Sequence, residues 1–186
     1  MRRDRIKWNR KYRSRSTALP AHPSEIVRNF YPLAARGRAL DIAAGNGRNA
    51  LFLAQQGFAV DALDIAEAGL RAVAGRHPAV RAACVDLDAY DLVPRRYNLV
   101  LNIRYLNRRL FPQIPAALTE GGLLIFETYL KRPNFIPQRA FCDDHLLRIN
   151  ELLLGFLKLE VVYYRETMTA ADAEPYPLAS LVAVKR

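Results

Sequence analysis

The residues best suited to chemistry in this chain are carboxylates and glycines that follow short apolar runs. Asp41 lies in the first such run, and Gly45 and Gly47 come directly after it. Asp64 closes the next apolar run along the chain. Glycines let a backbone approach a ligand closely, and a carboxylate at the end of a second strand can accept hydrogen bonds from both hydroxyls of a ribose. The pattern therefore predicts a site for a ligand that contains a nucleoside.

Two kinds of nucleoside ligand fit this pattern, a dinucleotide and S-adenosylmethionine. Residues 45–50 satisfy the loose form of the dinucleotide fingerprint G-x-G-x-x-G/A. A dinucleotide would place its pyrophosphate on the following helix N-terminus, where Asp41 would be an unfavourable negative neighbour. S-adenosylmethionine carries an ammonium and a sulfonium and no phosphate. We therefore expect Asp41 near the amino acid end of S-adenosylmethionine and Asp64 on its ribose.

An alternation of strands and helices must position these residues. Near-continuous apolar runs predict buried parallel strands over residues 39–43, 58–64, 80–86, 97–101 and 123–128. Helical spacing predicts helices over residues 24–33, 48–57, 66–76, 106–118 and 144–154, with Ser24 as an N-cap. Two further strands, 157–166 and 178–184, flank a polar connection at 167–177 that is too short for a helical crossover. Those two strands must therefore pair antiparallel.

The composition indicates a single globular domain in the cytoplasm. The chain has 186 residues, of which 51% are hydrophobic and 25% are charged, so it can bury a core. No apolar run approaches the roughly 18 residues that span a bilayer, so we expect no membrane segment. Cys84 and Cys142 are the only cysteines, and no apolar stretch follows the basic N-terminus, so neither a disulfide framework nor a signal peptide is indicated.

The positive charge is concentrated at the start of the chain. The formal net charge is +10, and residues 1–15 hold eight of the 28 lysines and arginines against one acid. Clustered cations attract phosphates, so this arm could bind nucleic acid, an anionic surface or an anionic substrate. A solvated tail is the alternative interpretation. We divide the chain into a basic N-terminal arm or lid, residues 1–21, and one domain, residues 22–186.

The motif Asp41-x-x-x-Gly45-x-Gly47 with Asp64 resembles that of class I S-adenosylmethionine-dependent methyltransferases. Residues 45–54 and the N-terminal segment 8–12 (Trp-Asn-Arg-Lys-Tyr) are similar to the TehB-like, tellurite-resistance branch. This resemblance implies an α/β, Rossmann-like fold with a mostly parallel seven-stranded sheet, an antiparallel C-terminal hairpin and helices on both faces. It also implies S-adenosyl-L-methionine as cofactor, an adenine beside the acid after strand three, and an N-terminal aromatic segment that helps to close the site.

The candidate site residues come from the glycine motif and from the ends of the strands. The candidate cofactor-binding residues are Asp41, Ala43, Gly45, Gly47, Asn49, Asp64, Ile65, Asp86, Leu87 and Asn102. The candidate catalytic residues are Arg104 and Tyr105, which follow strand four, and Tyr12 of the arm. Arginines outnumber acids around the expected acceptor pocket, which favours an anionic acceptor. No Cys/His grouping has the spacing of metal ligands, so we expect no metal.

Three functions remain open at this point. The first is methyl transfer to a small, anionic or nucleophilic acceptor. The second is modification of RNA, with the basic arm as the RNA-binding element. The third is cofactor binding without transfer, although that function would tolerate loss of the glycine motif, which is intact here.

Overall fold

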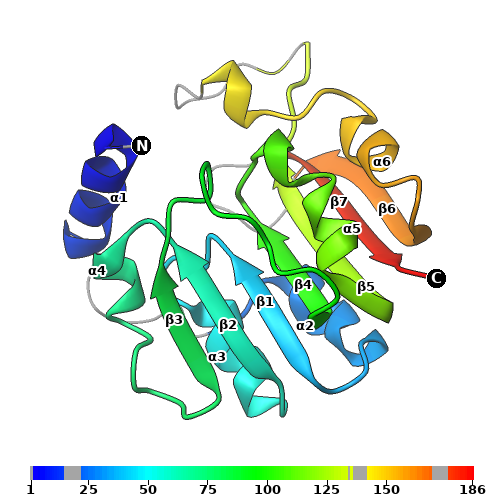
Figure 1. The fold of residues 1–186 in the computed structure, drawn as a ribbon. Helices are drawn as coiled ribbons and strands as arrows, with labels where there is room; N and C mark the ends of the chain where they lie inside the picture. Colours follow the sequence, from blue (N-terminus) through cyan, green and yellow to red (C-terminus); the bar gives the residue numbers. More distant parts are fainter. Residues whose placement is uncertain (1, 15–21, 134, 136–141, 169–175) are drawn as a thin grey trace.

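Seven strands of the computed structural model form one sheet in the order β3-β2-β1-β4-β5-β7-β6 (Figure 1). The structure describes residues 2–14, 22–133, 135, 142–168 and 176–186. The strands are β1 (Arg38–Ile42), β2 (Ala59–Asp64), β3 (Val80–Cys84), β4 (Tyr97–Ile103), β5 (Leu118–Tyr129), β6 (Glu160–Met168) and β7 (Pro177–Val184). The strands β1 to β5 run parallel, and β7 pairs antiparallel with both β5 and β6. The predicted fold class, including the antiparallel C-terminal hairpin, is confirmed.

Helices cover both faces of the sheet. The helices are α1 (Arg2–Ser14), α2 (Glu25–Phe30), α3 (Arg48–Gln55), α4 (Glu67–Leu70), α5 (Gln113–Ala117) and α6 (Glu151–Gly155), with three short 3-10 turns, η1 (Tyr31–Leu33), η2 (Arg108–Leu110) and η3 (Asp143–His145). One buried cluster joins the sheet to α2, α3 and α4, and a second joins it to α5 and α6. The apolar runs of β1, β2, β4 and β5 are largely buried because both faces of these strands pack against helices. The prediction of a buried strand over 80–86 is wrong, because β3 is an edge strand in which only Val80 is buried.

Three helices are much longer in the prediction than in the structure. Of the predicted helix over 66–76, only α4 (Glu67–Leu70) is helical. The chain then continues in turns, one of which is closed by a hydrogen bond of 3.0 Å from the Val73 N–H to the Leu70 carbonyl oxygen. The predicted helix over 106–118 becomes η2 and α5, which contains Pro115, a residue that cannot donate a backbone hydrogen bond. The predicted helix over 144–154 begins only at α6, because Asn150 at its N-cap position has a φ of 62°.

Strand β5 starts five residues before the predicted start. Leu118 pairs with Tyr97, and the register then shifts before Leu123 pairs with Leu99. Gly121 lies within this irregularity and has a φ of 72°. The Gly-Gly pair, which the sequence suggests as a turn before the strand, is therefore an irregularity within it. In the hairpin, residues 169–175 of the predicted connection lie outside the described residues.

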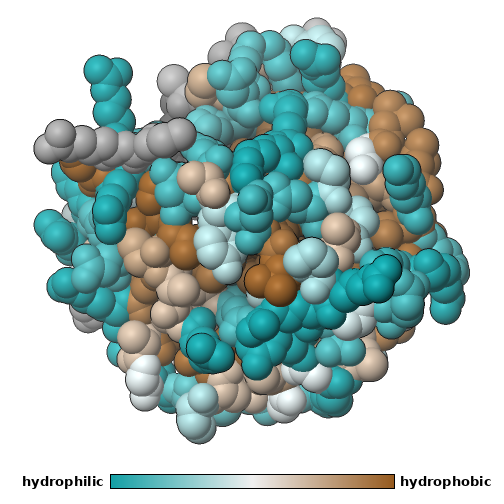
Figure 2. Space-filling model, viewed as in Figure 1, coloured by the Kyte–Doolittle hydropathy of each residue, from teal (hydrophilic) through white to brown (hydrophobic). Residues whose placement is uncertain are grey.

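The surface of the C-terminal edge is the most apolar part of the molecule in Figure 2, where brown side chains gather over α6 and β6. Among the described residues, large exposed hydrophobic side chains there include Leu154, Leu157, Val161 and Val162. None of the helices in the described part of the chain is both long and apolar enough to cross a membrane.

A polar cluster links the neighbouring strands β2, β1 and β4. It lies toward the beginnings of these strands, at the opposite edge of the sheet from the candidate site. The Asp61 carboxylate on β2 accepts hydrogen bonds from the Arg38 guanidinium on β1 at 2.9 and 3.0 Å, and from the Tyr97 hydroxyl on β4 at 3.2 Å. Only 13% of the Asp61 side chain is exposed. Burial, together with the Asp61 carboxylate, raises the pKa of Tyr97 to about 12.

We predict that Asp61→Ala lowers the free energy of unfolding by about 2 kcal/mol, because it removes a largely buried, charged acceptor from two partners. Urea unfolding measures this change. The control is Glu120→Ala, which removes a carboxylate that is 72% exposed and pairs with Lys185 at 3.5 Å. That control should cost less than about 1 kcal/mol. Equal effects of the two substitutions would contradict the stabilising role of this cluster.

Candidate cofactor and acceptor site

The glycine loop follows β1 at the edge where the parallel strands end. The backbone turns through three residues with positive φ, namely Ala43 (54°), Gly45 (61°) and Gly47 (75°). A Cβ atom on Gly47 would lie 2.6 Å from the Val73 side chain, so only glycine fits there. Ala43 is a non-glycine residue in a strained conformation, which proteins keep where the surrounding structure enforces it. The predicted loop is therefore present, and α3 begins directly after it.

The Asp64 carboxylate at the end of β2 holds this loop in place. One of its oxygens accepts a hydrogen bond from the Gly45 N–H at 2.8 Å, and the other accepts one from the Ala66 N–H at 2.7 Å. Asp64 is 7% exposed, and burial raises its pKa despite the two N–H donors. The residue that we expect on the ribose thus also joins the ends of β1 and β2.

Asp41 is the most deeply buried acid of the site. It is 2% exposed, and its Oδ2 atom has no hydrogen-bond partner among the described residues. Burial raises the pKa of Asp41 to about 7, and the nearby Asp64 carboxylate adds to the shift. Arg48 and the Ala50 N–H act in the opposite direction. An unpartnered carboxylate oxygen in this position is suited to a cationic group of a ligand.

The basic arm is folded as helix α1, which packs on α4 beside the glycine loop (Figure 1). A Cβ atom on Gly45 would lie 2.3 Å from the Tyr12 hydroxyl, so this tyrosine touches the loop. The Asn9 side chain accepts a hydrogen bond from the Ala68 N–H at 2.8 Å, which fixes α1 to α4. Trp8 stacks on Tyr12 with ring centroids 6.2 Å apart. Residues 15–21, and with them the predicted boundary between arm and domain, lie outside the described residues.

Two predicted cofactor-binding asparagines have structural partners. The Asn49 side chain accepts a hydrogen bond from the Ser24 N–H at 2.9 Å, and both residues are buried. Ser24 occupies the predicted N-cap position, but its hydroxyl accepts from Arg48 at 2.9 Å and does not cap α2. Asn102, at 1% exposure, donates to the Tyr105 carbonyl oxygen at 2.6 Å. Asn49 and Asn102 therefore shape the loops, and their contact with the cofactor stays a prediction.

The segment after β3 carries the predicted adenine residues. One oxygen of Asp86 accepts a hydrogen bond from the Asp88 N–H at 3.1 Å, and Leu87 is 4% exposed. The Tyr105 ring packs against the buried apolar cluster to which Leu87 belongs. Burial, together with the nearby carboxylates, raises the pKa of Tyr105 to about 12. Ile65 follows Asp64 and is half-buried. The structure thus brings the ends of β2, β3 and β4 together.

Arg104 lies at the end of β4 with a φ of 60°, beside Glu127 and Tyr129 of β5. Its guanidinium is 3.6 Å from a Glu127 oxygen and 5.1 Å from the centre of the Tyr129 ring. The other Glu127 oxygen accepts a hydrogen bond from the Ser180 hydroxyl at 2.9 Å. Nearby, Arg108 pairs with Glu151, so acids offset part of the arginine excess that the sequence suggested.

Sequence reasoning missed Asn107, the N-cap residue of η2, and Arg109 of η2, which both contact the segment after β3. The Asn107 side chain bonds to the Leu87 carbonyl oxygen and to Asp88, and Arg109 bonds to the Tyr90 carbonyl oxygen. The available signal was a polar run, Asn107-Arg108-Arg109, shortly after a buried strand that ends at the site. Such a run does not by itself indicate which loop it will contact.

Comparisons with known proteins agree with this geometry. The model of the family described as tellurite resistance protein TehB matches residues 5–122. None of the curated proteins matches the sequence. TehB from Haemophilus influenzae is similar in structure, with a TM-score of 0.75 and 18% identity over 98% of this chain and 67% of that chain.

Two other solved structures share the fold at similar identities. A SAM-dependent methyltransferase from Methanosarcina mazei has a TM-score of 0.69 and 16% identity, covering 88% of this chain and 98% of that one. The [4+2]-cyclase SpnF has a TM-score of 0.70 and 16% identity, covering 87% and 78%. At these identities the structures show a common fold, and the cyclase shows that this fold is not confined to methyltransferases. The family model, by contrast, spans well over half of the chain and includes the glycine loop, and the chain therefore belongs to the TehB family of S-adenosylmethionine-dependent methyltransferases.

Proposed function

We propose that this chain binds S-adenosylmethionine between Asp41 and Asp64 and transfers its methyl group to a small acceptor. The observation that carries this proposal is the buried Asp41 oxygen, which has no hydrogen-bond partner among the described residues. The amino group of S-adenosylmethionine is a cation that such a carboxylate would bind. A pyrophosphate in the same place would face two carboxylates, so the site fits S-adenosylmethionine better than a dinucleotide.

The other cofactor contacts follow the ends of the strands. Asp64 would accept hydrogen bonds from the ribose, with Ile65 beside it, and Asp86 and Leu87 would face the adenine. Gly45 and Gly47 would present their backbone groups to the cofactor in a turn that needs positive φ angles, with Tyr12 and Val73 packed where side chains would be. In this arrangement the cofactor would contact residues that follow β1, β2 and β3, three neighbouring strands whose ends lie at one edge of the sheet.

Bound S-adenosylmethionine would supply an activated methyl group on a sulfonium. The protein then needs to hold the acceptor in line and to keep water out, with little acid–base chemistry. Helix α1 is placed for the second task, because Tyr12 touches the glycine loop and Trp8 stacks on Tyr12. We therefore treat α1 as a lid of the same domain.

We place the acceptor beside Arg104 and Tyr105 at the end of β4. The Arg104 side chain is 26% exposed, and its contact with Glu127 is long at 3.6 Å, so an anionic acceptor can compete for the guanidinium. Because Arg104 and Glu127 carry opposite charges, this place also suits an acceptor that has both a positive and a negative group. An acceptor of this kind needs no nucleic-acid recognition module.

An RNA-modifying methyltransferase is the second candidate, and a hollow on α1 favours it. Arg5, Arg10 and Arg13 line this hollow together with Asn9 and Ser14. Three guanidinium groups around one depression are suited to phosphates. The hollow lies on the lid, however, and not at the strand ends where the methyl group would be.

The experiment that tests the proposed function is incubation of the purified chain with methyl-labelled S-adenosylmethionine and separated metabolite, RNA and protein fractions. Label in a small-molecule fraction supports the proposal, and label in RNA supports the second candidate. Binding of the cofactor with no label transferred to any fraction would contradict methyl transfer, as expected if the fold served another reaction.

Asp41→Asn should change stability and cofactor affinity in opposite directions. Because burial raises the pKa of Asp41 to about 7, the folded protein holds a proton there that the unfolded chain loses near pH 4. Stability of the cofactor-free protein should therefore fall as pH rises from about 4 to about 7, by at most about 4 kcal/mol from this group. The amide of the variant does not titrate, so the variant should be the more stable protein at pH 8.

The same variant should bind S-adenosylhomocysteine more weakly, by a factor on the order of ten or more, because it lacks the carboxylate for the amino group. For the parent, affinity should rise with pH through about 7 as Asp41 ionises. Thermal unfolding and calorimetry measure the two properties. A variant with parent-like affinity at pH 8 would remove Asp41 from the cofactor site.

Arg104→Ala should lower the rate of methyl transfer to an anionic acceptor far more than it lowers affinity for S-adenosylhomocysteine. The reason is that loss of acceptor positioning can cost on the order of a hundredfold in rate. Arg148→Ala, which removes an exposed arginine near α6, is the matched control and should leave the rate unchanged. If Arg104→Ala and the control behave alike at saturating cofactor, Arg104 does not hold the acceptor.

Salt separates the two candidate functions. If RNA is the acceptor, activity should fall steeply between about 50 and 200 mM salt, since each phosphate contact releases a counterion. Replacing Arg10 and Arg13 by glutamine should flatten that response. A flat salt response in the parent protein would favour the small acceptor.

A further inference from the structure

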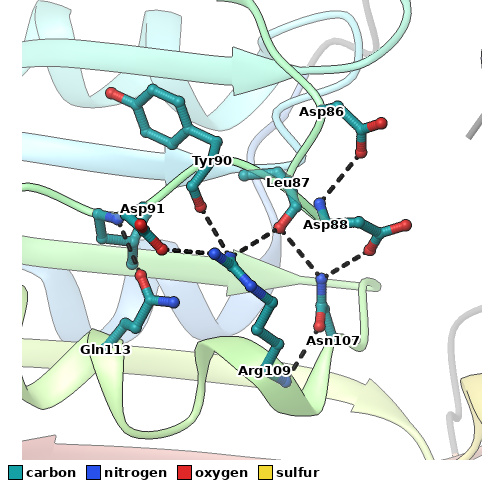
Figure 3. Close-up of polar contacts among 9 residues, drawn as sticks. Asp86, Leu87, Asp88, Tyr90, Asp91, Asn107, Arg109 and Gln113 are labelled. Atoms are coloured by element: carbon teal, nitrogen blue, oxygen red, sulfur yellow. Dashed lines mark hydrogen bonds and ion pairs between the residues drawn. The ribbon is translucent and has the colours of Figure 1, made fainter.

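The segment that follows β3 has no regular secondary structure, although it carries the proposed adenine residues. Residues 85–92 lead from the end of β3 through Asp86, Leu87 and Asp91, and no strand or helix fixes their backbone. Figure 3 shows that side chains from η2 and from α5 reach this segment. Its position therefore depends in part on side-chain contacts made by residues far away in the sequence.

Arg109 makes the most extensive of these contacts. One terminal nitrogen of its guanidinium donates to the Tyr90 carbonyl oxygen at 2.9 Å and to the Leu87 carbonyl oxygen at 3.4 Å. The other terminal nitrogen pairs with the Asp91 carboxylate. The Asp91 side chain is 78% exposed, so this ion pair contributes little on its own. The bonds to the two carbonyl oxygens are the ones that fix the backbone.

Asn107 lies beside Arg109 and reaches the same segment (Figure 3). Its side-chain nitrogen lies 2.9 Å from an Asp88 oxygen and 3.3 Å from the Leu87 carbonyl oxygen. Its side-chain oxygen accepts a hydrogen bond from the Arg109 N–H at 3.0 Å, which holds η2 in place. Asn107 and Arg109 thus converge on the carbonyl oxygen of Leu87, the residue next to Asp86.

The far end of the segment is closed by α5. The Gln113 side chain accepts a hydrogen bond from the Leu92 N–H at 2.9 Å, and Leu92 is 6% exposed. At the other end, the Val85 N–H donates to the Asp64 carbonyl oxygen at 2.9 Å. Between these ends, the Asp86 carbonyl oxygen accepts hydrogen bonds from the Ala89 and Tyr90 N–H groups at 3.0 and 2.8 Å, which close a local turn. The contacts of Asn107 and Arg109 hold this turn against the rest of the domain.

We propose that Arg109, supported by Asn107, is the positioning residue for adenine recognition. The inference rests on the proposed cofactor site. A carboxylate distinguishes an adenine, which presents an exocyclic amine, from a hypoxanthine, which presents a carbonyl oxygen, only while it is held at the base edge. Arg109 touches neither the base nor the reacting atoms, and acts through the backbone of residues 87–90.

The test compares the affinities of the full chain for S-adenosylhomocysteine and S-inosylhomocysteine by calorimetry. Arg109→Met keeps the side-chain stem but removes every donor, and should reduce the preference for the adenosyl compound by a factor on the order of ten. Asn107→Ala should reduce it in the same direction. Arg96→Met is the matched control, because Arg96 is a half-exposed arginine that pairs with Asp61 at the start of β4. This control should keep the parent preference.

A lower preference for the adenosyl compound in both variants would support the positioning role of Arg109. Equal loss of affinity for both compounds, with an unchanged preference, would show a general structural role and overturn the inference, as would parent-like behaviour of both folded variants. If Arg109→Met does not fold, Asn107→Ala provides the decisive comparison. A parent protein that binds neither compound would instead contradict the proposed cofactor site.

Discussion

The Asp64 carboxylate joins the loop after β1 to the loop after β2, and the geometry of the site depends on this link. One oxygen holds the Gly45 N–H after β1, and the other holds the Ala66 N–H after β2. The first bond fixes the glycine loop, and the second sets where α4 begins. Helix α1 then packs against both, because Asn9 bonds to Ala68 and Tyr12 touches Gly45. Helix α1, which we propose as a lid, is thus positioned by the same carboxylate that we place on the ribose.

This arrangement buries two neighbouring carboxylates, which is unfavourable for the folded state on its own. Desolvation raises the pKa of both Asp41 and Asp64, so the folded state favours their neutral forms. An apolar or amide side chain at position 41 would make the cofactor-free protein more stable. Binding of the cationic ligand that we propose would explain why an acid stands there, and such a trade of stability for binding is common in functional sites.

The sheet and the glycine loop could be predicted because their signals are local. Each parallel strand is a run of apolar residues, and the loop needs glycine at positions such as Gly47, where a side chain would collide with Val73. The helix lengths could not be predicted in the same way. Asn150 delays the start of one expected helix by adopting a positive φ, which the residue type permits but does not require.

The polar contacts of the site were the least predictable part. The sequence predicted Arg104 as a candidate catalytic residue but not its ion pair with Glu127, which the pairing of β4 with β5 brings about. Arg109 lies 19 residues from Tyr90, whose carbonyl it binds, and no local pattern connects the two. The sequence left the basic arm open as a binding arm, a lid or a solvated tail and did not predict a helix there. In the structure it forms α1, which packs on α4.

A crystal structure of the chain with S-adenosylhomocysteine tests most directly whether the cofactor lies between Asp41 and Asp64. We expect the ribose hydroxyls within hydrogen-bond distance of the Asp64 carboxylate and the amino group within the same distance of Asp41. A nucleoside bound elsewhere, with Asp41 still unpaired, would contradict this placement.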